Sequence, residues 1–137
     1  MKRKTILVTG GLGFIGSNLV LHLIKLNYFV IILDKKTYSS NLMYLRNIKK
    51  NQIKLIISDI NNKYQISKIL KKFNPVGIFN LAAETHVDRS IDNPEIFFKS
   101  NVKGVLVLLE QLRKYKKQNR QTNNLKRYFW TSTWSKY

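Results

Sequence analysis

A glycine-rich loop near the amino terminus constrains the fold more than any other stretch of this sequence. Residues 9–16 read TGGLGFIG, which fits the spacing G-x-G-x-x-G from Gly11 and G-x-x-G-x-x-G from Gly10. A β-rich apolar run, residues 4–9, leads into the loop, and helical spacing of apolar residues follows over 14–26. In that context glycines allow a tight turn, close approach of the backbone to a pyrophosphate and close packing of helix on strand. The loop therefore predicts a dinucleotide-binding unit, and a simple glycine turn is the alternative.

Strand and helix patterns alternate along the whole chain. We expect strands at residues 4–9, 28–33, 53–57, 76–81 and 126–131, and helices at residues 14–26, 41–48, 64–73 and 92–117. This alternation predicts an α/β fold, a Rossmann-like, doubly wound parallel sheet of five strands with helices on both faces. No linker or repeat divides the sequence, so we expect one domain over residues 1–137. Ligands bind such sheets at the carboxyl ends of the strands, which directs attention to the residues after each strand.

Two of the few acidic residues stand at such strand ends. Asp and Glu together number only 7, yet Asp34 ends the second predicted strand and Asp59 follows the third. A carboxylate at Asp34 can accept hydrogen bonds from an adenosine ribose and repel a 2′-phosphate, which favours NAD over NADP. Lys35 and Lys36 follow directly and could tolerate that phosphate. Asp59 is expected near the adenine. The alternatives are an ordinary strand-end acid at Asp34 and a turn-forming one at Asp59.

The segment after the fourth predicted strand carries small and polar residues. Residues 80–83 read NLAA, where small side chains would let a cofactor lie against the backbone, or would simply allow tight packing. His86 could act as a base or a ligand, although an isolated histidine is more often structural. The other histidine, His22, is not at metal-binding spacing, and we expect no metal site. A Tyr-x-x-x-Lys match at residues 64–68 lies on the wrong helix for catalysis and is interpreted as chance.

The composition is strongly basic, with a net charge of +18 and pI ≈ 10.3. Such a charge can indicate a nucleic-acid partner, but the lysines are scattered over every segment instead of clustering with arginines and aromatic residues. Drift toward residues with AT-rich codons is the favoured explanation. The chain has no cysteine, no recognisable signal peptide and no apolar stretch long enough for a membrane span, so we expect a cytoplasmic protein.

Four stretches together resemble the extended short-chain dehydrogenase/reductase family. They are ILVTGGLGFIGSN (6–18), LDKKTYSSNLMYL (33–45), SDI (58–60) and NLAAETHVDRSIDNPEIFFKSNVKG (80–104). Within that family the likeness is greatest to the dTDP-glucose 4,6-dehydratases. The resemblance implies NAD as cofactor, dTDP-glucose or a related nucleotide sugar as substrate, and a homodimer for full-length relatives. It also implies a cycle in which C4 of the sugar is oxidised, water is lost across C5 and C6, and hydride returns to C6.

The resemblance assigns roles to individual positions. Thr85 would contact both the cofactor and the sugar, and Thr133 would contact the sugar. The cofactor would be held by the glycine loop, the adenosine-binding residues and the segment after the fourth strand: Gly10, Gly13, Phe14, Ile15, Gly16, Asp34, Lys35, Lys36, Thr37, Asp59, Ile60, Leu81, Ala82, Ala83, Thr85 and Ser100.

The catalytic positions depart from the family pattern. Family members carry an Asp-Glu pair after the fifth strand, where this chain has Trp134 and Ser135, which cannot perform the acid–base chemistry of two carboxylates. The expected Tyr-x-x-x-Lys helix and sugar-binding domain are also missing. We therefore expect an interrupted amino-terminal portion that binds NAD weakly or misfolds and has no dehydratase activity alone. The alternatives are another nucleotide-sugar epimerase or dehydratase, a basic nucleic-acid-binding module, and a decayed reading frame.

Overall fold

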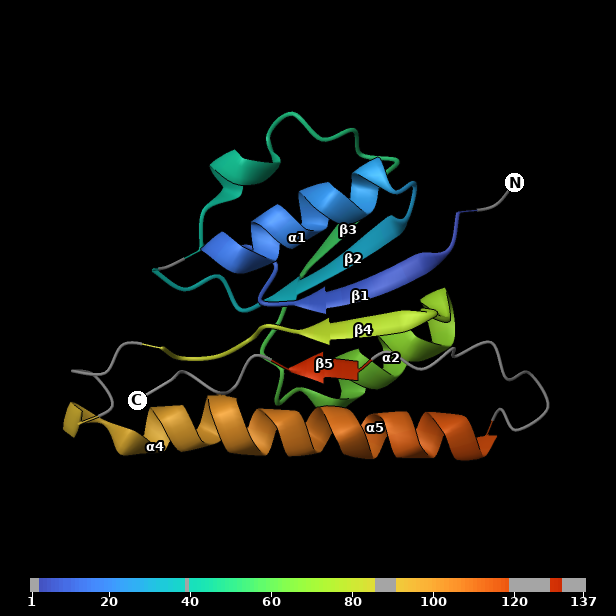
Figure 1. Ribbon diagram of the computed structural model, residues 1–137. Helices are drawn as coiled ribbons and strands as arrows, with labels where there is room; N and C mark the ends of the chain where they lie inside the picture. The colour runs from blue at the N-terminus through green and yellow to red at the C-terminus, as the bar shows by residue number, and fades with distance from the viewer. Residues whose placement is uncertain (1–2, 39, 86–90, 119–128, 132–137) are drawn as a thin grey trace.

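A single parallel sheet forms the centre of the molecule (Figure 1). The computed structural model describes residues 3–38, 40–85 and 91–118, and the backbone of residues 129–131. Its strands run in the order β3-β2-β1-β4-β5, and every neighbouring pair is parallel. Their bounds are Thr5–Thr9 for β1, Phe29–Asp34 for β2, Ile53–Ile57 for β3, Gly77–Asn80 for β4 and Phe129–Thr131 for β5. The predicted five-stranded parallel sheet is confirmed.

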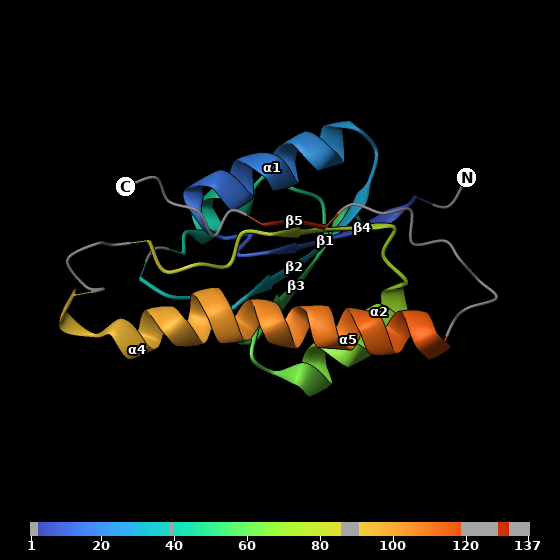
Figure 2. The ribbon, with the colours of Figure 1, turned by 60° about the horizontal axis from the view of Figure 1, so that its bottom comes forward.

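Helices cover both faces of the sheet, as expected for a doubly wound fold (Figure 2). Helix α1 lies on one face, and α2 and α5 lie on the other. The bounds are Phe14–Lys25 for α1, Leu42–Leu45 for the 3-10 helix η1, Lys63–Phe73 for α2, Pro94–Phe97 for α4, Phe98–Lys103 for the π-helical segment η2 and Gly104–Gln118 for α5.

Alternate residues of the central strands enter two separate hydrophobic cores. On β1, Val8 faces the core beneath α1, whereas Leu7 faces the core beneath α2 and α5. On β2, Ile32 and Ile31 divide between the same two cores. All four side chains are fully buried. Successive side chains of a strand point to opposite faces, so a strand covered on both sides must be apolar throughout. This is why residues 28–33 read as an uninterrupted apolar run.

The structure corrects three of the predicted elements. The helix expected at residues 92–117 begins at Pro94, and its π-helical turns, Phe98–Lys103, carry Ser100 into a buried position. The helix expected at 41–48 is only a 3-10 turn over Leu42–Leu45, because its amides bond to the residue three positions back, as Arg46 N–H does to the carbonyl of Met43. Strand β5 covers Phe129–Thr131 of the predicted 126–131, and the remainder lies outside the described residues.

Candidate functional site

The order of the strands reverses between β1 and β4, which places a crevice at their carboxyl ends. Two buried polar side chains join the strands at this point. The Thr9 hydroxyl donates to Asn80 Oδ1 at 2.5 Å, and the same hydroxyl oxygen accepts from the Ala82 amide at 3.3 Å. The loops that follow β1 and β4 are therefore held side by side.

The glycines of the loop allow its backbone to approach neighbouring backbone closely. Gly10 has a φ of +66°, and a Cβ there would lie 2.6 Å from the carbonyl atoms of Leu81. A Cβ on Gly16 would lie 2.1 Å from the Gly10 carbonyl oxygen. A Cβ on Gly13 would approach only that same oxygen, at 3.4 Å. Gly10 and Gly16 are thus required by packing, whereas Gly13 has space beside it.

Among the residues that the structure describes, no side chain caps the start of helix α1. Gly13 occupies the N-cap position, and the first turn of the helix contains no acidic residue. The first amides of an α-helix lack partners inside the helix, and they lie at the positive end of its dipole. Phe14 and Ile15 are 73% and 65% exposed, which is unusual for such large apolar side chains. This helix start fits a bound phosphate group.

The carboxylate of Asp34 organises the loops on both sides of it. Its Oδ2 accepts from the Leu12 amide at 3.0 Å, and its Oδ1 accepts from the Lys36 amide at 2.8 Å and the Ser40 hydroxyl at 2.9 Å. Asp34 is only 7% exposed. A carboxylate offers about four acceptor positions, so these bonds leave room for a ribose hydroxyl. Lys36 has a φ of 57°, a left-handed conformation that the turn around Asp34 imposes.

Lys35 connects this loop to the far side of the crevice. Its ammonium group lies 2.7 Å from Glu84 Oε1 and 3.2 Å from the Ser100 hydroxyl. The backbone of Glu84 is fixed in turn by Asn101, whose Oδ1 accepts from the Glu84 amide and whose Nδ2 donates to the Glu84 carbonyl, both at 2.9 Å. One network therefore joins the loop after β2, the segment after β4 and the π-helical turns.

Asp59 follows β3 at the adenine end of the expected site. Partial burial alone would raise the pKa of this carboxyl, but hydrogen bonds from the backbone and side-chain amides of Asn61, at 2.7 and 2.8 Å, lower it. The positive charges of Lys35 and Lys99 lower it further, and the net pKa lies below the ordinary value of 3.8. Asp59 is consequently a charged acceptor in neutral solution.

This lowered pKa predicts a specific pH dependence of stability. Because the folded pKa is below 3.8, the contribution of the Asp59 carboxylate is complete above 3.8 and is lost as the pH falls through the folded value. In urea unfolding at pH 5.5 and pH 3, the wild type should lose more stability between the two conditions than the Asp59→Asn variant. Equal losses in the two proteins would contradict this assignment.

The crevice collects residues from the loop after every strand from β1 to β4. Ten of the predicted cofactor residues line it: Gly10, Gly13, Asp34, Lys35, Thr37, Ile60, Leu81, Ala82, Ala83 and Ser100. Four lining residues were missed by the sequence prediction: Leu33, Ser40, Ser58 and Glu84. Leu33, Ser58 and Glu84 directly adjoin predicted residues, and Ser40 lies within the stretch 33–45 that carries the family resemblance, so both signals could have indicated them.

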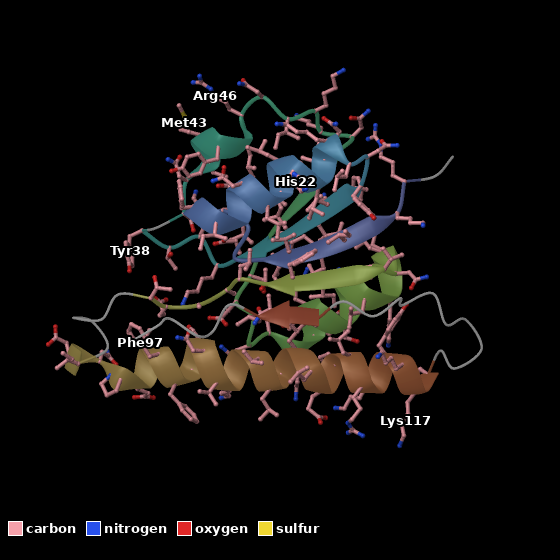
Figure 3. The ribbon with its side chains drawn as sticks, viewed as in Figure 1. His22, Tyr38, Met43, Arg46, Phe97 and Lys117 are labelled. Atoms are coloured by element: carbon pink, nitrogen blue, oxygen red, sulfur yellow. The ribbon has the colours of Figure 1, made fainter. Side chains whose placement is uncertain are left out.

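Other predicted residues lie beside the crevice or beyond it. Phe14, Ile15, Gly16, Lys36, Asp59 and Thr85 are not among its lining residues, and the Thr85 side chain is exposed. The candidate sugar contact Thr133, the replacements Trp134 and Ser135, and His86 lie outside the described residues. Figure 3 shows His22 on α1, where it belongs to the last turn and not to the glycine loop.

Two general properties concern the described part of the chain. No helix within it combines the length and the apolar character that crossing a membrane requires. No cluster of three or more His, Cys, Asp or Glu side chains within it could hold a metal ion.

Comparison with known proteins gives a consistent match. The family model described as GDP-mannose 4,6 dehydratase matches residues 7–137. The dTDP-glucose 4,6-dehydratase of Salmonella typhimurium is 43% identical over 112 residues, which cover 80% of this chain and 31% of that enzyme. The chain thus spans about a third of the length of the curated relatives it matches.

Solved structures show the same likeness. A dTDP-glucose 4,6-dehydratase from Streptomyces venezuelae, solved with NAD bound, is 34% identical with a TM-score of 0.75, covering 81% of this chain and 36% of its own. A UDP-glucose 4-epimerase from Thermotoga maritima, solved with UDP-glucose, is 36% identical with a TM-score of 0.72, covering 81% and 34%. The fold is therefore shared by dehydratases and epimerases of nucleotide sugars.

Proposed function

Because the chain belongs to the GDP-mannose 4,6 dehydratase family, we propose that it is the NAD-binding Rossmann domain of a nucleotide-sugar 4,6-dehydratase. The proposed domain spans residues 1–137. Bound NAD supplies a reversible hydride acceptor in such enzymes. The relatives named dTDP-glucose 4,6-dehydratase support dTDP-glucose, or a related nucleotide sugar, as the substrate of the whole enzyme. Another nucleotide-sugar epimerase or dehydratase is the alternative.

The observation that carries this proposal is the uncapped start of α1 beside the Asp34 carboxylate. The free amides of the first turn would bind the pyrophosphate, and the missing Cβ of Gly13 leaves space for it. The remaining acceptor capacity of Asp34 suits the adenosine ribose. Asp59 and the backbone at Ile60 would flank the adenine, and Ala82 and Ala83 would let the nicotinamide half lie against the chain after β4.

Calorimetric titration of the purified 137-residue chain with NAD tests the proposal. We expect weak, saturable binding that depends little on salt, because shaped amides and a ribose acceptor supply the contacts. A single-stranded oligonucleotide is the comparison ligand, chosen because of the net charge of +18. Oligonucleotide binding that falls steeply with salt, together with no NAD binding, would replace the proposal by a nucleic-acid-binding function.

We expect no dehydratase activity from this chain. Trp134 and Ser135 stand where the family has its two carboxylates, and neither an indole nor a hydroxyl can supply that acid–base chemistry. The measurement is incubation of the chain with NAD and dTDP-glucose, followed by detection of the 4-keto-6-deoxy product. Turnover would contradict the account of these two positions.

The outer face of the η2–α5 helix supports a contact between two copies of the domain. Its exposed apolar residues follow helical spacing and are Phe98, Val102, Leu106 and Leu109, each between 43% and 60% exposed. Pairing of two such stripes would remove them from water. Sedimentation should therefore show a concentration-dependent dimer that Leu106→Lys converts to monomer. A wild type that stays monomeric at all concentrations would contradict this contact.

A further inference from the structure

The ammonium group of Lys35 lies in the crevice but is already engaged by the protein. Two of the three N–H groups of a lysine are accounted for by Glu84 Oε1 at 2.7 Å and the Ser100 hydroxyl at 3.2 Å. The two side chains of the ion pair are 34% and 13% exposed, so the carboxylate is well shielded from solvent. The positive charge next to Asp34 is thus balanced by a fixed negative charge from the other side of the crevice.

We propose that Glu84 is a specificity-determining residue that makes the domain prefer NAD to NADP, by holding Lys35 away from a 2′-phosphate. This inference rests on the proposed NAD site. A lysine next to the ribose-binding carboxylate is the kind of residue that can compensate a 2′-phosphate, as an arginine does in NADP-binding sites. Asp34 alone repels the phosphate, but an unpaired Lys35 would offset that repulsion.

The position of Glu84 is built into the fold and does not depend on its side chain alone. Asn101 of the π-helical turns makes two hydrogen bonds to the Glu84 backbone, one to its amide and one to its carbonyl. Ser100, the neighbour of Asn101, contacts Lys35 directly and is 7% exposed. The π-helical turns therefore position both partners of the Lys35 ammonium group.

Lys36 does not compensate a 2′-phosphate in place of Lys35. Its amide donates a hydrogen bond to Asp34 Oδ1, and its backbone adopts a left-handed conformation with a φ of 57°. It is exposed, as Lys35 is, but unlike Lys35 it does not line the crevice. A charge outside the crevice is screened by more water and salt than one that lines it, so Lys36 contributes less than Lys35 to binding a phosphate there. The balance between the two cofactors depends on Lys35.

The experiment is calorimetric titration of wild type and Glu84→Gln with NAD and with NADP. Glutamine keeps the size of the side chain and an acceptor oxygen for Lys35, but it removes the charge. We expect the affinity for NADP relative to NAD to rise about fivefold in the variant, the effect of a charge contact at a partly exposed site. Near-ultraviolet circular dichroism verifies that the variant keeps its tertiary packing.

Two further variants test whether Lys35 causes the change in cofactor preference and control for the change in net charge. The double variant E84Q/K35M should return to the wild-type ratio of NADP to NAD affinity. Glu110→Gln removes the same charge from an exposed pair with Arg113 on α5, 3.1 Å apart, and should leave the ratio unchanged. A rise in E110Q equal to that in E84Q, or a persistent rise in the double variant, would overturn the proposal.

Each remaining outcome decides either the role of Glu84 or the existence of the NAD site. Wild type that binds NAD while E84Q shows an unchanged ratio overturns the role of Glu84 and leaves the NAD site intact. Wild type that binds neither nucleotide overturns the NAD site itself. If E84Q does not fold, Glu84→Asp decides: its shorter side chain keeps the charge but withdraws the carboxylate from the Lys35 ammonium group, so we expect a smaller rise in the ratio, and an unchanged ratio would overturn the proposal.

Discussion

The Gly16→Ala variant is expected to lose about 3 kcal/mol or more of stability, enough to unfold much of the population. The added Cβ would lie 2.1 Å from the Gly10 carbonyl oxygen and 2.8 Å from the Gly11 Cα. Both are backbone atoms of a loop that is itself packed against Leu81, so no side chain can move aside to relieve the clash. Urea unfolding monitored by circular dichroism gives the free energy directly.

Gly13→Ala is the matched control, because it places the same methyl group in the same loop without a clash. Its Cβ would be 3.4 Å from its nearest neighbour, and the backbone, at φ −73°, suits alanine. We expect a change in stability within about 1 kcal/mol, together with a marked loss of NAD affinity because the methyl occupies the phosphate turn. Equal destabilisation by both substitutions would contradict the loop geometry, and unchanged NAD binding in G13A would contradict the phosphate position.

Asp34→Asn should cost about 2 kcal/mol of stability and most of the NAD affinity. Three donors converge on the carboxylate, namely the Leu12 amide, the Lys36 amide and the Ser40 hydroxyl. An asparagine keeps the shape but sets an NH₂ group against at least one of those donors, and the residue is buried. The proposed ribose contact would also lose its charged acceptor. Urea unfolding and NAD calorimetry measure the two effects separately.

Ser40→Ala provides a graded comparison for Asp34. It removes one donor to the carboxylate and the acceptor for the Thr37 amide, at 2.9 and 3.0 Å, without placing a donor against a donor. We expect a loss of about 1 kcal/mol, smaller than for D34N. If D34N is as stable as the wild type, or if S40A is the more damaging substitution, Asp34 does not organise these loops in the way described.

The architecture could be predicted because its signals are local. Buried strands and amphipathic helices can each be recognised within about ten residues of sequence, and the glycine loop lies directly between a strand and a helix. Parallel pairing then follows from their alternation. The same reasoning placed Asp34 and Asp59 correctly at strand ends, since the carboxyl ends of parallel strands lie at one edge of the sheet.

The interior of the site could not be predicted in this way because it depends on distant contacts. Lys35 and Glu84 are 49 positions apart, and Lys35 and Ser100 are 65 apart. The π-helical turns that position Ser100 leave no distinct spacing in the sequence. Lys35 was predicted to bind the cofactor, but nothing in the neighbouring sequence indicated that its charge is balanced from across the crevice. This charge balance depends on the contact between the loop after β2 and the segment after β4, and the sequence pattern of neither segment reveals it.

Mapping NAD onto the chain by nuclear magnetic resonance tests the cofactor site residue by residue. In a titration of the ¹⁵N-labelled 137-residue chain, the account predicts that amide shifts concentrate in residues 10–16, 34–37, 58–60 and 81–84, which surround the crevice. The same titration of Gly13→Ala should show much smaller shifts at equal NAD concentration. Absence of shifts in these segments, or shifts confined to the basic end of α5, would show that NAD does not bind at the proposed site.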